Sequence, residues 1–78
     1  MEIIYTNHAE EKLAERKISK REIEKSLKNP DAVLDGRDDV KIVHKLIRDK
    51  LLRIAYKSEK DFLLVITAYY THPERYEE

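Results

Sequence analysis

The residues of this chain that could do chemistry are imidazoles, guanidinium groups and hydroxyls, with no thiol among them. His8 lies in the first turn of an expected helix, where unpaired amides and the helix dipole disfavour a proton on the ring. Arg53 interrupts the apolar run Leu51–Ala55, where an unpaired charge would be costly. The segment Thr67–Tyr76 concentrates hydroxyls, an imidazole and a guanidinium. Metal-free RNA cleavage requires a general base, cations that stabilise a pentavalent phosphate, and an acid that protonates the leaving oxygen. These residue types could supply all three.

Other chemistries are disfavoured by what the sequence lacks. A glycine-rich phosphate loop is implausible in a chain whose only glycine is Gly36. No two histidines stand at metal-ligand spacing, and no serine lies in a nucleophile elbow. The absence of cysteine removes disulfides, a thiolate nucleophile and sulfur-ligated zinc. We therefore predict neither a metal nor a cofactor.

Each candidate residue also has a purely structural interpretation. His8 could be a partial helix cap or a packing residue. Arg16, about two turns later, could aim at phosphate or complement the helix dipole. Arg53 could bind a ligand or pair with a carboxylate, or its face of the sheet could be exposed to solvent. Tyr69 and Tyr70 could stack on unpaired bases or fill the core.

The charges are unevenly distributed, although they cancel over the whole chain. Residues 1–39 sum to −2 and residues 58–78 to −3, whereas residues 40–57 sum to +5. This basic block is an electrostatic footprint for phosphate or a solvated strand surface. The charged content of 41%, rich in Lys, Arg and Glu and without Gln, suggests a thermophile protein.

Local signals for secondary structure are strongest around Ser19. Ser19 can cap a helix because the side chain of Glu22 can reach back to its amide, while Ile18 and Ile23 occupy the staple positions. Helices are expected at about 8–17 and 20–28, the second ending before Pro30. After a β-prone segment at 1–5 and both helices, strands are expected at about 32–34, 40–48, 51–57 and 62–70.

This order of elements predicts a single domain over residues 1–78 of class α+β. Two N-terminal helices would pack on one face of a mostly antiparallel sheet of about four strands. The last strand is apolar on both sides, which favours an interior position or a covered edge. The tail at 71–78 is expected to be only partly ordered. No run approaches the roughly 20 apolar residues that span a bilayer, and no leader is evident, so we expect a cytoplasmic protein without membrane contact.

The two middle strands form a hairpin with distinct faces. A turn at Asp49–Lys50 would place Arg48 opposite Leu51 and His44 opposite Ala55. One face would pack on the helices and carry Val43, Ile47, Leu52, Ile54 and Tyr56, together with Lys45. The other, basic face would carry His44, Arg48, Arg53 and Lys57 among Ile42, Leu46 and Leu51. The basic face is the candidate functional face.

Short motifs along the chain resemble a widespread family of small domains of unknown function. The motifs are His8-Ala9, Leu13, Arg16, Ile18-Ser19, Glu22-Ile23, Leu27, Pro30, Leu52–Tyr56, Val65–Tyr69 and Arg75-Tyr76. That family is similar to the RelE-like toxins, in the barnase, colicin and RelE class of metal-independent ribonucleases. The resemblance implies two helices followed by an antiparallel sheet, and an mRNA-cleaving toxin with a cognate antitoxin. By position it implicates His8, Arg53, Thr67, Tyr69 or Tyr70 and, as weaker matches, Lys45 and Arg75.

Strand parity conflicts with this set of residues. A four-residue loop at Ser58–Asp61 would put Tyr70 on the face of Arg53 and Thr67 on the opposite face. A bulge would be needed to reunite Thr67, or Lys45, with Arg53.

The sequence therefore predicts the toxin of a type II toxin–antitoxin pair, a metal-independent endoribonuclease that cleaves mRNA. Its catalytic residues would be His8, Arg53, Thr67, Tyr70 and His72. RNA would be bound by Arg16, Lys45, Arg48, Lys57, Tyr69 and Arg75. The expected partners are RNA and an antitoxin that lays an acidic or apolar segment across the basic face. The alternatives are a non-catalytic RNA- or protein-binding module and a homodimer joined through the last strand.

Overall fold

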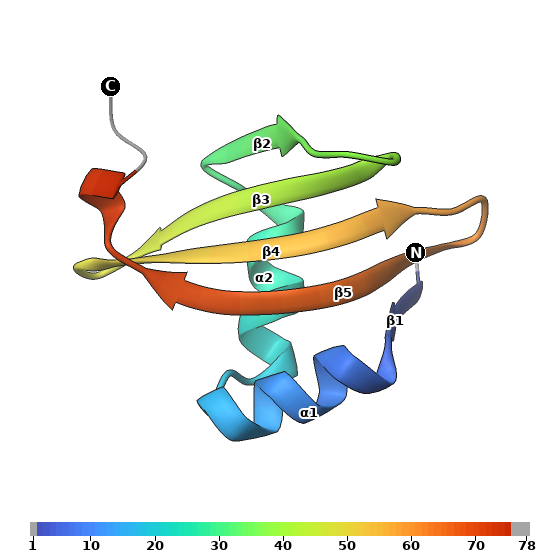
Figure 1. Cartoon of the computed structure of the whole chain (residues 1–78), viewed down its shortest axis with the longest axis horizontal. Coiled ribbons are helices and arrows are strands. Elements are labelled where there is room, and N and C mark those ends of the chain that lie inside the picture. The colour runs from blue at the N-terminus through green and yellow to red at the C-terminus, as the bar shows by residue number, and fades with distance from the viewer. Residues whose placement is uncertain (1, 76–78) are drawn as a thin grey trace.

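The computed structural model describes residues 2–75, which form two helices, a five-stranded sheet and a short 3-10 helix (Figure 1). In chain order these are β1 (Glu2–Tyr5), α1 (Asn7–Arg16), α2 (Lys20–Lys28), β2 (Ala32–Asp35), β3 (Val40–Ile47), β4 (Lys50–Ser58), β5 (Phe62–Thr71) and η1 (Pro73–Arg75). The order of strands in the sheet is β1-β5-β4-β3-β2. Helix α2 crosses one face of the sheet, and α1 lies along its β5 side (Figure 1).

The predicted sheet was wrong in strand number and in pairing. The sheet has five strands, and it is mixed because β1 runs parallel to β5, with Glu2 beside Phe62 and Tyr5 beside Val65. The apolar strand β5 needs a neighbour on each side, and β4 and β1 provide them. Strand β5 is interior over 62–65, as its apolar character predicted.

Both helices begin at side-chain caps. The Thr6 hydroxyl accepts a hydrogen bond from the Ala9 amide at 3.0 Å, and the Ser19 hydroxyl accepts one from the Glu22 amide at 3.1 Å. Helix α1 ends at Lys17, whose φ of 57° is left-handed. The predicted bounds are confirmed for α2 and are one residue late for α1. These caps fix the positions at which α1 and α2 begin.

The turn between β3 and β4 lies one residue earlier than predicted. Arg48 and Asp49 form it, with Arg48 at a φ of 58°, so that His44 pairs with Arg53 and not with Ala55. Moving the turn by one residue shifts each pairing by two, which leaves every side chain on its predicted face. The apolar face is confirmed by the burial of its central residues Val43, Leu52 and Ile54.

A β-bulge at Ile66 separates the two halves of β5. Ala55 pairs with Thr67, whereas the next residue along β4, Tyr56, pairs with Val65, so Ile66 is the extra residue. The Ile66 carbonyl accepts a hydrogen bond from the Thr6 hydroxyl at 3.2 Å. The bulge reverses the predicted faces: Thr67 lies on the face of Arg53, and Tyr70 lies on the opposite face.

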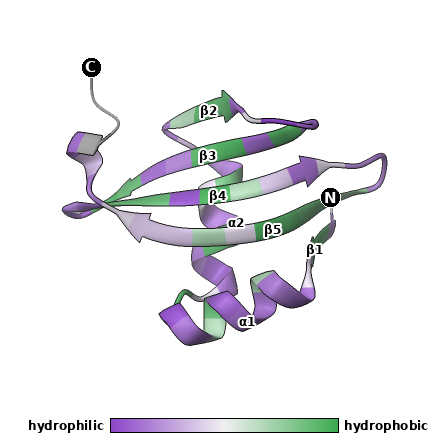
Figure 2. Cartoon of the chain, viewed as in Figure 1, coloured by the Kyte–Doolittle hydropathy of each residue, from purple (hydrophilic) through white to green (hydrophobic). Residues whose placement is uncertain are grey.

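The hydrophobic core lies between the helices and one face of the sheet. Figure 2 shows hydrophobic residues within β3, β4 and β5, whereas the helices are mainly hydrophilic. The core consists of Ala9, Leu13, Ile18, Ile23, Val43, Leu52, Ile54, Val65 and Ala68. The helices therefore cover one face of the sheet and leave the other without a helical layer.

Part of the predicted flexible tail belongs to regular structure. Thr71 ends β5 and residues 73–75 form η1, while residues 76–78 of that tail lie outside the described part of the chain. Among the described residues, no helix is both long and apolar enough to cross a membrane.

Candidate functional site

The face of the sheet without helices carries a set of polar residues in one row. We call it the open face, and it is formed by the side chains that alternate with those of the core. His44 on β3 pairs with Arg53 on β4, and Arg53 pairs with Tyr69 on β5. Around this row the open face carries Leu34, Ile42, Leu46, Leu51, Ala55, Lys57 and Thr67.

Hydrogen bonds join the three residues of the row. Arg53 donates from Nε to Nε2 of His44 at 3.0 Å and from Nη1 to the hydroxyl of Tyr69 at 2.5 Å. The Arg53 guanidinium also lies 5.6 Å from the centre of the Tyr69 ring. One arginine thus orients an imidazole and a phenol from the two neighbouring strands.

The environment of His44 favours its neutral form. The residue is only 7% exposed, and its burial, followed by the charge of Arg53, lowers its pKa. Because Nε2 accepts from Arg53, the proton of the neutral ring is assigned to Nδ1. The row therefore places a lone pair of a neutral imidazole against a guanidinium.

Arg16 reaches the same row from α1. Its Nη1 donates to the Ala68 carbonyl at 2.8 Å, and its guanidinium lies 5.9 Å from the centre of the Tyr69 ring. Strand β1 pairs with β5 only as far as Val65, so this carbonyl lies beyond the end of β1. Arg16 therefore contacts the part of β5 that β1 leaves uncovered.

Two of the predicted catalytic residues lie away from this row. His8 is exposed in the first turn of α1, eight positions before Arg16, the last residue of α1, which contacts Tyr69. Tyr70 lies on the helix-covered face, where its hydroxyl is 2.8 and 3.1 Å from the carboxylate oxygens of Glu22. Burial and the Glu22 carboxylate raise the pKa of Tyr70 to about 12. Tyr70 joins β5 to α2.

The other predicted catalytic residues divide between the open face and the end of β5. Thr67 shares the face of Arg53 and Tyr69, two residues along β5 from Tyr69. His72 is exposed just after β5, where it lines a small cavity with Lys50. The bulge thus brings Thr67 toward the row, as the resemblance requires.

The predicted RNA-binding cations are dispersed. Lys45 lies on the helix-covered face, 3.5 Å from Asp31, and Arg48 is exposed in the β3–β4 turn. Lys57 shares the open face, four residues along β4 from Arg53, and Arg75 belongs to η1. Of the predicted RNA-binding set, Tyr69 contacts Arg53, and Arg16 contacts Tyr69.

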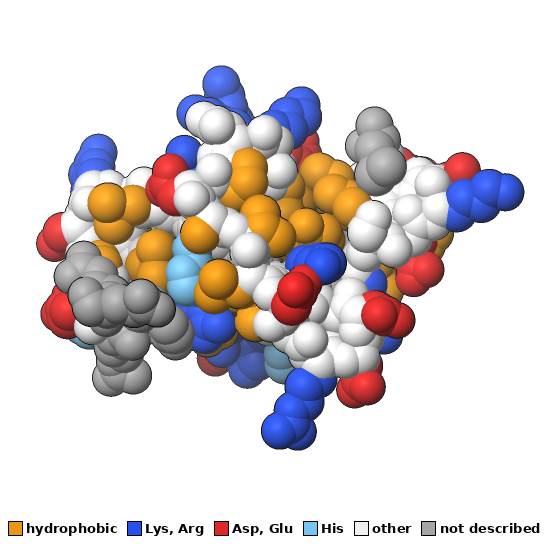
Figure 3. All heavy atoms as spheres, turned by 90° about the horizontal axis from the view of Figure 1, so that it is seen from above, with side chains coloured by type: hydrophobic (Ala, Val, Ile, Leu, Met, Phe, Trp, Pro, Cys, Tyr) orange, Lys and Arg blue, Asp and Glu red, His pale blue; other side chains and the backbone are white. Residues whose placement is uncertain are grey.

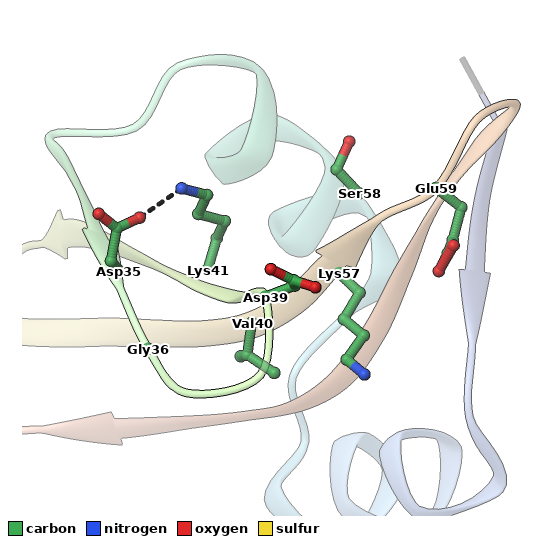
Figure 4. A pocket seen from close by; sticks show the side chains of 8 residues that line it. All are labelled: Asp35, Gly36, Asp39, Val40, Lys41, Lys57, Ser58 and Glu59. Carbon is green, nitrogen blue, oxygen red and sulfur yellow. Dashed lines mark hydrogen bonds and ion pairs between the residues drawn. The ribbon is translucent and has the colours of Figure 1, made fainter.

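The cavity in Figure 4 lies apart from the row and is lined by side chains of both charges. It has a volume of about 490 Å³, and it lies between the β2–β3 connection and the end of β4 (Figure 4). An ion pair between Asp35 and Lys41 stands on one side, and Asp39 and Lys57 contribute charges of both signs. None of the three residues of the row lines this cavity.

Sequence reasoning placed His44 on the functional face but did not include it in the site. The signal was a single imidazole within an apolar strand, and the misplaced turn paired it with Ala55 in place of Arg53. Within residues 2–75, no group of three His, Asp or Glu side chains could hold a metal ion.

Comparison with known proteins places the chain in a family. Searches of the curated proteins and of the solved structures found no significant match. A family described as a domain of unknown function, DUF4258, matches residues 5–70, which include both helices and all but the last residue of β5. The chain therefore belongs to the DUF4258 family.

Proposed function

We propose that this domain is a metal-independent endoribonuclease that cleaves single-stranded RNA. The observation that carries the proposal is the hydrogen-bonded row of His44, Arg53 and Tyr69 on the open face. It combines a neutral imidazole, a guanidinium and a phenol, which are the groups that transesterification at phosphorus needs. Substrates that lie across an open sheet are strands whose bases are unpaired.

The reaction proceeds by attack of the 2′-hydroxyl on the neighbouring phosphorus. The substrate phosphate draws the Arg53 guanidinium toward itself and so releases Nε2 of His44, which accepts the 2′-hydroxyl proton as the new P–O bond forms. The bond from phosphorus to the 5′ oxygen breaks, and the Tyr69 hydroxyl gives its proton to that oxygen. The products are a 2′,3′-cyclic phosphate and a 5′-hydroxyl, and proton exchange with solvent restores both side chains.

A second candidate function is RNA binding without cleavage. It is favoured by the burial of His44, which is 7% exposed and whose Nε2 is occupied by Arg53. An imidazole in that position can serve only to orient the arginine, and the arginine then binds phosphate without chemistry. Cleavage requires that the contact between Arg53 and His44 opens when substrate binds.

We further propose that the domain acts as the toxin of a toxin–antitoxin pair. This step is supported by the resemblance of its motifs to those of RelE-like toxins. An antitoxin segment would cover the row and the hydrophobic side chains beside it, of which Leu34 and Leu46 are 41% and 52% exposed. Figure 3, which views the molecule from the β2 side, shows hydrophobic side chains exposed there. An apolar or acidic segment suits such a surface.

The test of cleavage compares four proteins on end-labelled single-stranded RNA in EDTA. These are the wild type, His44→Gln, Arg53→Gln and Arg21→Gln, the last removing an exposed charge from α2. We expect wild type and Arg21→Gln to yield fragments ending in 2′,3′-cyclic phosphate. His44→Gln and Arg53→Gln should each be slower by roughly 10²- to 10⁴-fold.

Each remaining outcome decides against part of the proposal. Equal cleavage by all four proteins would show that the row is not the active site. RNA retention without cleavage, weakened by Arg53→Gln, would establish the binding module instead. Neither cleavage nor retention would reject both functions.

A further inference from the structure

We infer that Arg16 and Arg53 bind two successive phosphates of one RNA strand, with the Tyr69 ring as the spacer between them. The inference rests on the proposed function for the identity of the ligand. It assigns Arg16, a residue of α1, to the same substrate as the strand residues. It also changes the expected role of Tyr69 from a stacking platform for a base to a support for two cations.

The position of Arg53 is set from within the sheet. Its Nε and Nη1 are held by His44 and by the Tyr69 hydroxyl, so the guanidinium is fixed in the row. When the contact with His44 opens in the proposed reaction, the contact with the Tyr69 hydroxyl still orients the guanidinium toward the phosphate.

Arg16 is also anchored, but by a single backbone contact. One of its five N–H donors is directed to the Ala68 carbonyl, and the residue as a whole is exposed. Within residues 2–75, no carboxylate lies within ion-pair distance of Arg16, and its neighbour one turn earlier is the cation Lys12. The remaining donors of Arg16 can therefore form the bidentate contact that suits a phosphate.

Tyr69 lies between the two guanidinium groups. Arg53 approaches it from β4, and Arg16 approaches it from α1, on the side of β5 that faces away from β4 (Figure 1). Both guanidinium groups lie within 6 Å of the ring centre, at 5.9 and 5.6 Å. Two guanidinium groups that both contact one ring are close enough to bind successive phosphates of one strand, and their contacts with the ring compete with the stacking of a base on it.

A purely structural role for Arg16, as a link between α1 and β5, predicts a different response to salt. Each phosphate contact releases counterions, so log K falls as log salt rises. The loss of one phosphate contact reduces the magnitude of this slope by about 0.7 for a single strand. A structural link would change the thermal midpoint and leave this slope unaltered. The two roles are therefore separable by measurement.

The experiment measures binding of an uncleavable 2′-O-methyl RNA over a range of salt concentrations. Arg16→Gln should lower the slope by about 0.7 relative to wild type, and Arg16→Lys should recover most of it because the charge is retained. Arg21→Gln removes the same charge from the surface of α2 and is the matched control. Thermal unfolding of each variant separates loss of a contact from loss of the fold.

The number of phosphates provides a second readout. A dinucleoside monophosphate carries one phosphate, and a trinucleoside diphosphate carries two. The loss of affinity caused by Arg16→Gln should therefore be at least about fivefold larger for the trinucleoside diphosphate than for the dinucleoside monophosphate. An equal loss for both ligands, or a salt slope equal to that of Arg21→Gln, would overturn the inference.

These outcomes also distinguish the inference from the proposed function. Binding with the expected slopes but without cleavage of ordinary RNA would support the phosphate pair and reject the nuclease. Cleavage that depends on Arg53 but shows no dependence on Arg16 would support the nuclease and reject the pair. No binding to any RNA would reject both.

Discussion

Tyr69 and Tyr70 are neighbours in sequence, yet they belong to opposite faces of the sheet. Tyr70 points into the helix-covered side and holds Glu22 of α2, whereas Tyr69 meets two arginines on the open face. The helix-covered face contains the packed core, whereas the open face carries, among apolar neighbours, the row of polar side chains that orient one another. Two residues of the same type therefore differ in their contacts because they lie on different faces of the sheet.

The largest expected difference between the two faces is in their contribution to stability, and Leu52 tests it. Leu52 is fully buried beneath the helices, so Leu52→Ala should lower the free energy of unfolding by about 2–5 kcal/mol. Leu46→Ala, on the open face, is the matched control and should change it by less than about 0.5 kcal/mol. Urea unfolding followed by circular dichroism measures both. Equal losses would mean that the open face is also a packed layer.

The two tyrosines offer a finer test. Tyr70→Phe removes a hydrogen bond to a carboxylate and should lower the free energy of unfolding by about 1.5 kcal/mol, with RNA binding retained. Tyr69→Phe should have the opposite profile, with a small loss of stability and slower RNA cleavage. Urea unfolding and the cleavage assay on both variants measure the contrast. The same profile for both variants would remove the functional distinction between the faces.

The smallest expected effect is the pH dependence contributed by His44. Its pKa is lowered in the folded state, so the unfolded chain binds more protons between that lowered pKa and about 6.5, the ordinary value. The contribution to stability is complete above about 6.5 and is lost as the pH falls through the lowered pKa. Each unit of pKa difference corresponds to about 1.4 kcal/mol.

This pH dependence is measured by urea unfolding of wild type and His44→Gln at several pH values. The stability of wild type relative to the variant should fall as the solution is acidified below pH 6.5. Parallel curves for the two proteins would show that His44 does not titrate differently in the folded state. If His44 is also the base, the acidic limb of cleavage lies below pH 6.5 and is absent from any residual activity of the variant.

The features that could be predicted from the sequence are those set by local interactions. The cap at Ser19 and the end of α2 before Pro30 depend on residues within one turn of each other. The two faces of the β3–β4 hairpin follow from alternation along each strand, which is why the core residues Val43 and Ile54 were placed correctly although the turn was not.

The features that could not be predicted depend on contacts between distant residues. The pairing of β1 with β5 joins segments 60 residues apart, and no local pattern encodes it. The extra residue at Ile66 is accommodated by pairing with β4 and by a hydrogen bond from Thr6, so the sequence of β5 alone does not reveal it. Two residues of the row, Arg53 and Tyr69, were therefore predicted from the sequence, while the geometry of the row was not.

The parallel pairing of β1 with β5 also bears on how the chain folds during synthesis. The first strand leaves the ribosome early, but its partner begins only at Phe62, and α1 packs mainly on that same late strand. Strand β1 and helix α1 therefore lack their main tertiary partner while β2, β3 and β4 are made. Completion of the domain is therefore a late event, and a ribosome that stalls before β5 would hold a chain in which β1 and α1 have no strand on which to dock.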